Sequence, residues 1–324
     1  MLNITDYKEE FLAYLKERIV VKEPENLYAP IDYILDLGGK RLRPILVLMG
    51  VDAFGASYKN GFDAALAVEV FHNFTLLHDD IMDAAPLRRK KPTVHEKWDV
   101  NTAILSGDAM MIMAYQLLEA YDGAQFKQLM QLFSKTSIEV CEGQQYDMDF
   151  ETRNDVSIPE YIEMIRLKTS VLVAAALKMG AIIAGANDEE AQKIYDFGLN
   201  LGLAFQLQDD YLDAFGDPAT FGKQIGGDII ENKKTYLFLQ ALAHADKAQK
   251  EELTALFSGS ATDIDSKVAR VKELFVSIGS DLLTQKEIKT YTEKAFSVLE
   301  DVQIPEDKKL VLRAFGESLM TRTV

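Results

Sequence analysis

Two short acidic motifs contain the side chains best suited to chemistry in this chain. The first is DDIMD, residues 79–83, and the second is DDYLD, residues 209–213; each ends an apolar helical run. On a helix, residues three and four apart share a face, so each motif gathers like charges on one turn. A divalent cation relieves that repulsion, and hard oxygen ligands suit Mg²⁺ that bridges to phosphates. One such motif is most simply a solvated acidic face, but two copies predict metal ligands at Asp79, Asp80, Asp83, Asp209, Asp210 and Asp213.

Basic residues cluster near these motifs, although the chain as a whole is acidic. The clusters are GGKRLRP at 38–44, RRKK at 88–91, Lys223, and the pair Lys233-Lys234. Each cluster alone could be a solvated charged loop, and Gly38-Gly39 also fits the C-cap of a helix. Beside metal-binding acidic turns, however, Arg and Lys suit the remaining oxygens of a diphosphate. The pattern therefore favours a site for diphosphates and divalent cations.

The elements that must position these residues are helices. Apolar residues recur at spacings of three and four, and no alternating stretch bounded by hairpin turns stands out. Ser157 is suited to cap a helix whose first turn contains Pro159. No linker divides the chain, so we predict one all-α domain, residues 1–324, with the two acidic turns facing across a groove. The predicted helices are 6–18, 29–37, 42–54, 61–83, 96–120, 124–150, 158–184, 189–213, 235–245 and three more before the C-terminus.

Composition argues against several partners and compartments. The chain has 324 residues and a net charge of −16, which disfavours nucleic acid and anionic membranes as partners. Its longest apolar stretch, 171–186, is interrupted by Lys178 and predicts a buried helix rather than a membrane span. The N-terminus is acidic and amphipathic, unlike a signal or transit peptide. Cys141 is the single cysteine, fits a cytoplasmic protein, and is expected to be a small core residue.

Other catalytic chemistries lack their motifs. The histidines form no HExxH zinc motif, and neither a GxSxG nucleophile turn nor a GxxxxGK[ST] phosphate loop occurs. Zinc hydrolysis, acyl transfer and P-loop NTP hydrolysis are therefore disfavoured.

Five motifs together resemble those of the trans-isoprenyl diphosphate synthases, the polyprenyl synthetase family. In chain order they are GGKRLRP (38–44), HDDIMDAAPLRRKKPTVH (78–95), RLKTSVL (166–172), FQLQDDYLDAFGD (205–217) and FGKQIGGDIIENKKTYL (221–237). The resemblance extends from about residue 27 to at least residue 240. It implies an isoprenoid synthase fold, with long helices around a deep central cavity, and a homodimer. It also implies head-to-tail condensation of isopentenyl diphosphate with an allylic diphosphate to a short-chain trans-prenyl diphosphate, using three Mg²⁺ ions and releasing diphosphate.

The resemblance further implies roles for individual residues. Two Mg²⁺ ions would be held by Asp79 and Asp83 and the third by Asp209, supported by Asp80, Asp210, Asp213 and, through metal-bound water, Asp228. Isopentenyl diphosphate would be bound by Lys40, Arg43, His72 and Arg89. The allylic diphosphate would be bound by Arg88, Lys168, Lys223 and Lys233, while Gln206 and the Thr169 region would face the developing allylic cation. The family commonly has Gly after the arginine pair, so Lys90 departs from its pattern and puts the loop's backbone conformation in question.

Two residues before the first acidic motif are candidates for setting product length. Thr75 is four residues before Asp79, on the same face and about 6 Å deeper along the helix. Phe74 stands beside it, where the family often places the residue that stops chain growth. With Phe74 as a partial floor and the smaller Thr75 leaving room, we predict geranylgeranyl diphosphate over farnesyl diphosphate. Ordinary helix packing is the alternative role for Phe74.

Two other functions compete with this hypothesis. A class I terpene cyclase shares the fold and the first acidic motif, but it binds no second diphosphate, so GGKRLRP and Arg88-Arg89 would have no purpose. A non-catalytic subunit of a heteromeric prenyl synthase would tend to lose an acidic motif, and both are intact here.

Overall fold

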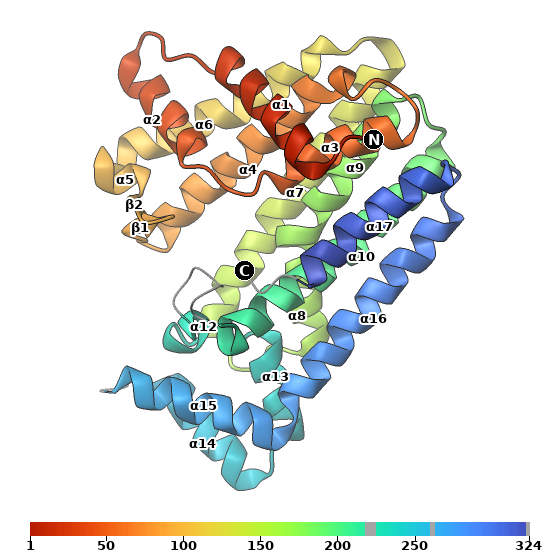
Figure 1. Cartoon of the computed structure of the whole chain (residues 1–324). Coiled ribbons are helices and arrows are strands. Elements are labelled where there is room, and N and C mark those ends of the chain that lie inside the picture. Colours follow the sequence, from red (N-terminus) through yellow and green to blue (C-terminus); the bar gives the residue numbers. More distant parts are fainter. Residues whose placement is uncertain (218–224, 260–262, 322–324) are drawn as a thin grey trace. The chain divides into compact units, whose positions relative to one another are not determined.

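The computed structural model describes residues 1–217, 225–259 and 263–321 (Figure 1). Within these ranges the chain is helical almost throughout, which confirms the predicted all-α class. The elements are α1 (Ile4–Arg18), α2 (Glu25–Asp36), α3 (Leu42–Ala53), η1 (Tyr58–Gly61), α4 (Phe62–Met82), β1 (Leu87–Arg88), β2 (Lys91–Pro92), α5 (Val94–Lys97), α6 (Val100–Leu117), η2 (Leu118–Ala120), α7 (Gly123–Thr152), α8 (Ile158–Ile165), η3 (Arg166–Ser170), α9 (Val171–Ile183), α10 (Asp188–Phe215), α12 (Gly227–Ile230), α13 (Tyr236–His244), α14 (Lys247–Ser258), α15 (Ile264–Ile278), α16 (Ser280–Asp301) and α17 (Glu306–Met320). None of these helices combines the length and apolar character that a bilayer crossing demands.

The chain forms two compact units. The first contains residues 1–135, 175–192 and 303–308, and the second contains residues 136–174, 193–302 and 309–324. Helices α7, α9, α10 and α17 contribute residues to both units. The single domain over 1–324, its central cavity and the groove between the acidic turns stay predictions.

Helix α4 is the central element of the first unit. Every residue from Ala64 to Phe71 is buried, so this part of the helix is surrounded by other elements. It packs against α3 and α6, and α6 packs in turn against α2. The last turn of α4, which ends at Met82, belongs to the first acidic motif. The core of this unit therefore fixes the position of that motif.

Helices α8 and α10 position the second acidic motif in the second unit. Ser157 and Glu160 form a capping box at the start of α8, with Pro159 in its first turn, so the predicted start signal is confirmed. Apolar side chains of α8 and α10, including Met164, Ile165 and Leu207, share one core with α13 and α15. The buried apolar side of α10 thus anchors the turn that bears residues 209–213.

Several predicted elements need correction. The helix predicted at 158–184 is interrupted by η3, a five-residue π-helical turn. The helix predicted at 29–37 begins earlier, at Glu25, with Pro30 inside it. After α13 the described chain has the four helices α14 to α17 rather than the three that were predicted.

Cys141 is exposed, so the prediction of a core residue is wrong. The buried face of α7 passes through Val140 and Gly143. Cys141 follows Val140 directly and is rotated by about 100° around the helix, away from that face. The apolar stretch that begins at Val171, in contrast, is buried as predicted.

Candidate active site

The first acidic motif closes α4 in the first unit. Asp83 is the C-cap residue, so the carboxylates lie where the last carbonyls already carry partial negative charge. Asp80 is only 2% exposed, and Arg88 forks onto it, with Nε 2.8 Å from Oδ2 and Nη2 2.7 Å from Oδ1. Burial raises the pKa of Asp80, and the Arg88 hydrogen bonds oppose that rise. Asp79 lies 3.8 Å from the same guanidinium. The inner carboxylate therefore has a protein partner, and the outer face of the motif suits a cation.

Two arginines of the 38–44 segment have different surroundings. Arg41 is 5% exposed and donates to Glu69 and to the Leu35 carbonyl, so it is a structural residue. Arg43 Nη1 lies 3.2 Å from His72 Nε2. Burial, reinforced by the positive charge of Arg43, lowers the pKa of His72 well below its usual value, so this imidazole is neutral at pH 7. A guanidinium beside a neutral imidazole can offer its donors to a diphosphate.

A short hairpin brings Arg89 to the same region. Arg88 pairs with Lys91 across β1 and β2, and the two turn residues have positive φ, 52° at Arg89 and 64° at Lys90. Such φ values at both central positions are typical of type I′ turns. Arg89 donates to the Gly38 carbonyl, and a Cβ at Gly39 would lie 2.7 Å from Arg89 Nη2. Lys90 therefore adopts a conformation that glycine prefers, which answers the question raised by its departure from the family pattern.

Phe74 and Thr75 lie on α4, between His72 and the first acidic motif in the sequence. Phe74 is 8% exposed, and its ring centroid lies 5.6 Å from that of Phe71 and 4.8 Å from that of His78. His78 in turn lies against Gly107 of α6, where a Cβ would be 2.6 Å from His78 Cδ2. Thr75 Oγ1 donates to the His72 carbonyl at 2.8 Å. The Phe74 ring is thus fixed by its neighbours, and its role in product length stays a prediction.

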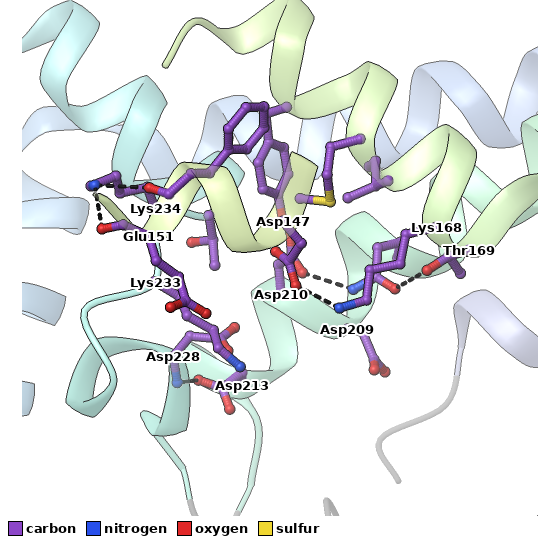
Figure 2. Close-up of a pocket in the computed structure, with 16 residues that line it drawn as sticks. Asp147, Glu151, Lys168, Thr169, Asp209, Asp210, Asp213, Asp228, Lys233 and Lys234 are labelled. Carbon is purple, nitrogen blue, oxygen red and sulfur yellow. Dashed lines mark hydrogen bonds and ion pairs between the residues drawn. The ribbon is translucent and has the colours of Figure 1, made fainter. Parts of the chain in front are cut away.

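The second acidic motif lines a polar pocket in the second unit (Figure 2). The walls come from α7, α8, η3, α10, α12 and the segment before α13. The acidic lining residues are Asp147, Glu151, Asp209, Asp210, Asp213 and Asp228, and the basic ones are Lys168, Lys233 and Lys234. A wall of carboxylates interspersed with lysines suits a hard cation that carries a phosphate group.

Asp210 is the buried member of this motif, only 5% exposed. It accepts hydrogen bonds from Tyr161 Oη at 2.5 Å and from Gln206 Nε2 at 3.1 Å. Burial raises the pKa of Asp210 to about 8, the charge of Asp228 adds to the rise, and the two hydrogen bonds oppose it. Like Asp80 in the first motif, Asp210 therefore has protein donors in a buried position.

The π turn η3 presents two predicted residues to the pocket. Its wider turn is closed by the Val171 amide, which donates to the Arg166 carbonyl, and by Ser170 Oγ, 3.3 Å from the Ile165 carbonyl. Lys168 Nζ lies 2.5 Å from Asp147 Oδ2, and Thr169 Oγ1 donates to Gln206 Oε1 at 3.0 Å (Figure 2). Single π turns inside α-helices occur frequently at functional sites.

The remaining walls are fixed by α12 and the lysine pair. The Asp228 amide donates to Asp213 Oδ2 at 3.0 Å. Lys233 Nζ lies 2.8 Å from Glu231. Lys234 turns to the end of α7 and donates to the Phe150 carbonyl at 2.9 Å, the Glu151 carbonyl at 3.0 Å and the Arg153 carbonyl. Lys234 thus caps a helix, which leaves Lys233 as the ligand candidate of the pair.

Similarity to known proteins identifies the family of this chain. A family model described as polyprenyl synthetase matches residues 24–275. The chain belongs to the polyprenyl synthetase family. Geranylgeranyl diphosphate synthase of Methanosarcina mazei is 39% identical over 303 residues, which are 93% of this chain and 91% of the relative. Geranylfarnesyl diphosphate synthase of Natronomonas pharaonis is 38% identical over 284 residues, 82% of each chain.

Solved structures of the family have the same fold. A geranylgeranyl pyrophosphate synthase crystal structure that is 56% identical superposes with a TM-score of 0.96 and covers 99% of both chains. Another, from Corynebacterium glutamicum, is 29% identical with a TM-score of 0.86, covers 98% of this chain and 97% of its own, and is complexed with isoprenyl diphosphate and magnesium. The predicted isoprenoid synthase fold is therefore confirmed.

The predicted site residues fall into the two units of this polyprenyl synthetase. The first unit brings together Arg43, His72, Arg88 and Arg89, and it also contains the acidic motif at the end of α4. Lys40 belongs to the same unit and is exposed. The second brings together Lys168, Thr169, Gln206 and Lys233 with Asp209, Asp210, Asp213 and Asp228. Lys223 lies outside the described residues.

The donor set fits the magnesium that the family uses, although it is not a closed metal cage. Among the described residues, no three His, Cys, Asp or Glu side chains already converge as a metal cluster. Mg²⁺ usually keeps several waters and combines one or two carboxylates with substrate phosphates, so a line of carboxylates beside lysines is the arrangement it needs.

Sequence reasoning missed several residues of this site. Asp147 and Tyr161 line the pocket but belong to neither acidic motif and to no basic cluster. Lys234 belongs to the predicted pair Lys233-Lys234, but its role as a helix cap was not predicted. Tyr161 had a partial signal, because it is seven residues before Lys168, which would be two turns of the uninterrupted helix predicted at 158–184. Asp147 had no such signal, since its partner lies on another helix.

Proposed function

We propose that this protein condenses isopentenyl diphosphate head-to-tail with an allylic diphosphate, forming geranylgeranyl diphosphate and releasing diphosphate. The observation that carries the proposal is the pocket in which the DDYLD turn meets Lys168, Lys233 and the Thr169–Gln206 pair. Allylic ionisation requires carboxylates that bind a metal cation and lysines that stabilise the departing diphosphate anion. A neutral amide beside them can face the allylic cation.

Three Mg²⁺ ions would complete the site. Asp79 and Asp83 are proposed to hold two of them and Asp209 the third, while Asp80, Asp210 and Asp213 support these ligands and Asp228 acts through bound water. Bound Mg²⁺ would neutralise diphosphate oxygens and so favour cleavage of the allylic C–O bond. The buried contacts of Asp80 with Arg88, and of Asp210 with Tyr161, agree with supporting roles.

Each diphosphate has its own set of basic residues in the proposal. Isopentenyl diphosphate would be bound by Lys40, Arg43, His72 and Arg89, and the allylic diphosphate by Arg88, Lys168, Lys223 and Lys233. Arg43 supports the first assignment, because its residue is only partly exposed and its hydrogen bond to His72 goes to a neutral group. A guanidinium that is partly shielded from water forms stronger charge-assisted hydrogen bonds with an anionic ligand than a fully hydrated one does.

The reaction then follows from the charges of these side chains. Lys168 and Lys233 stabilise the leaving diphosphate as its C–O bond breaks, and the allylic fragment becomes a cation. Gln206 and Thr169 present oxygen atoms to that cation, which the isopentenyl double bond attacks. The new cation loses a proton, and because no side chain of the motifs is an evident base, the departing diphosphate accepts it.

Product length is proposed to depend on Phe74 and Thr75. Phe74 is nearly buried between aromatic neighbours, so its ring is a firm stop rather than a mobile side chain. The smaller Thr75 leaves space beside it. We therefore propose geranylgeranyl diphosphate as the main product.

A homodimer is proposed as the assembly. Helix α6 exposes a row of large apolar side chains, Ile104, Leu105 and Ile112, which are 42%, 62% and 60% exposed. An apolar face of this kind is typical of an interaction surface, and a second copy of the chain supplies a matching face. Sedimentation of the wild type and of Leu105→Glu tests this, with a monomer expected for the variant.

The function is tested by giving the pure protein Mg²⁺, isopentenyl diphosphate and each of dimethylallyl, geranyl and farnesyl diphosphate. The proposal predicts geranylgeranyl diphosphate by mass spectrometry. Farnesyl or geranylfarnesyl diphosphate as end product would refute the proposed length. A cyclic hydrocarbon formed without isopentenyl diphosphate would establish a terpene cyclase, and no turnover by the chain alone would favour a non-catalytic subunit.

A further inference from the structure

The middle carboxylate of the second acidic motif is turned away from solvent. Asp210 is 5% exposed, and each of its two oxygens accepts a hydrogen bond from a protein donor, Oδ2 from Tyr161 and Oδ1 from Gln206. Its neighbours Asp209 and Asp213 are partly exposed along the same pocket. The motif therefore divides into outer carboxylates suited to an ion and an inner one committed to the protein.

Tyr161 is the less obvious member of this arrangement. It is 5% exposed on α8, lines the pocket, and places its hydroxyl 2.5 Å from Asp210 Oδ2. A phenylalanine would fill the same space but offer no donor. A buried carboxylate that loses such a donor lacks one of its hydrogen bonds, and its side chain is then held less firmly in place.

Asp210 also decides which way the Gln206 amide faces. Gln206 Nε2 donates to Asp210 Oδ1 at 3.1 Å, while Gln206 Oε1 accepts from Thr169 Oγ1 at 3.0 Å. The reversed amide would put its oxygen against the carboxylate and its NH₂ group beside Thr169. The negative end of the amide dipole would then no longer lie on the Thr169 side of the pocket.

We infer that Tyr161 and Asp210 are positioning residues, which hold Gln206 so that its carbonyl oxygen, beside Thr169, is the end presented to the developing cation. Asp210 serves as the anchor of this chain of hydrogen bonds and does not bind the ion directly. The inference rests on the proposed condensation and adds a role to a residue, Tyr161, that no motif of the sequence singled out.

Tyr161→Phe tests the inference by removing one oxygen. We expect kcat to fall about 10-fold, the loss of one well-placed hydrogen bond. The KM values of both substrates and the Mg²⁺ concentration for half-maximal rate should stay unchanged. In a Gln206→Ala background the same substitution should have almost no further effect, because both changes break one chain of contacts.

Tyr236→Phe is the matched control. Tyr236 is also buried in the second unit, and its hydroxyl accepts from Gln240 Nε2 at 2.8 Å, outside the pocket lining. Its removal should leave kcat within twofold of wild type. Asp210→Asn should reproduce the kcat loss of Tyr161→Phe at an unchanged Mg²⁺ requirement.

The outcomes separate the inference from the function on which it rests. Wild-type protein that forms no prenyl diphosphate refutes the proposed condensation. If the wild type is active, either of two results refutes the positioning role. One is a Tyr161→Phe variant as active as the wild type, and the other is additive losses of kcat when Tyr161→Phe is combined with Gln206→Ala. A raised Mg²⁺ requirement in Asp210→Asn shows that Asp210 is a ligand and overturns the inference.

Discussion

Replacing Gly143 with alanine should displace the π turn that presents Lys168 and Thr169. Gly143 lies on α7 directly against η3, and a Cβ there would be closest to the Lys168 backbone nitrogen and 2.7 Å from both Lys168 Cα and the Leu167 carbonyl carbon. These are backbone atoms, which cannot rotate aside as a side chain can. Gly202 of α10 also meets η3, since its Cβ would be 2.8 Å from Ser170 Cα. The turn is therefore in backbone contact with two helices and has few directions in which to move.

The size of the effect follows from these distances. Carbon atoms in favourable contact are about 3.5–4.0 Å apart, so relief of the Gly143→Ala contact needs a movement of about 1 Å. A misplacement of about 1 Å at a catalytic group can lower the rate about 100-fold. We expect kcat to fall roughly 100-fold, because Lys168 and Thr169 move together with the turn.

Steady-state kinetics and thermal unfolding should be measured on the same preparations. Gly316→Ala is the control: its Cβ would lie 2.9 Å from Phe296 Cε1, a ring edge that can shift. That variant should lose about 1 kcal/mol of stability through overpacking and keep its kcat. In a Lys168→Ala background, Gly143→Ala should cost much less than in wild type, because part of what it displaces is already gone.

A folded Gly143→Ala protein with kcat within threefold of wild type would refute the reasoning. If the substitution prevents folding, Gly202→Ala provides the same test with a smaller displacement, and an unchanged kcat there is equally contradictory. Equal losses with and without Lys168 would show that Gly143 acts elsewhere than through the turn.

Three further substitutions test other parts of the structure. Lys90→Gly should stabilise the protein by about 1 kcal/mol in denaturant unfolding, because Lys90 has a φ of 64°, whereas Lys91→Gly in β2 should not stabilise it. Lys234→Met should cost roughly 2 kcal/mol in the same assay, since three carbonyls at the end of α7 lose one charged donor, and exposed Lys250→Met is the neutral control. Phe74→Ala should lengthen the product seen by mass spectrometry; an unchanged product would exclude Phe74 as the floor.

The parts of the site that follow a local pattern could be predicted from the sequence. The acidic motifs end α4 and α10, and Ser157 begins α8, because helix periodicity and capping depend on neighbours within a few residues. The basic clusters could be found in the same way. Their division into structural and ligand-facing members could not, since Arg41 and Lys234 are distinguished from Arg43 and Lys233 only by distant partners such as Glu69 and the end of α7.

The π turn was out of reach of sequence patterns for a similar reason. RLKTS fits an α-helix by composition, and the extra residue in the turn is accommodated by contacts with Gly143 and Gly202, which are distant along the chain. Tyr161, Asp147 and the hairpin at Arg89 likewise depend on tertiary partners or on turns too short to show a period. Local patterns thus indicated the candidate site residues, and packing determined how these residues are oriented.

The most direct test of the proposed chemistry is diphosphate release by the pure protein with Mg²⁺ and isopentenyl diphosphate, an allylic diphosphate, or both. We predict release only with both substrates present, no release with EDTA, and a loss of at least 100-fold in kcat for Asp209→Asn. Asp265 is exposed, and the control variant Asp265→Asn should have the same kcat as the wild type. Release from the allylic diphosphate alone, or an Asp209→Asn variant as active as wild type, would contradict the account.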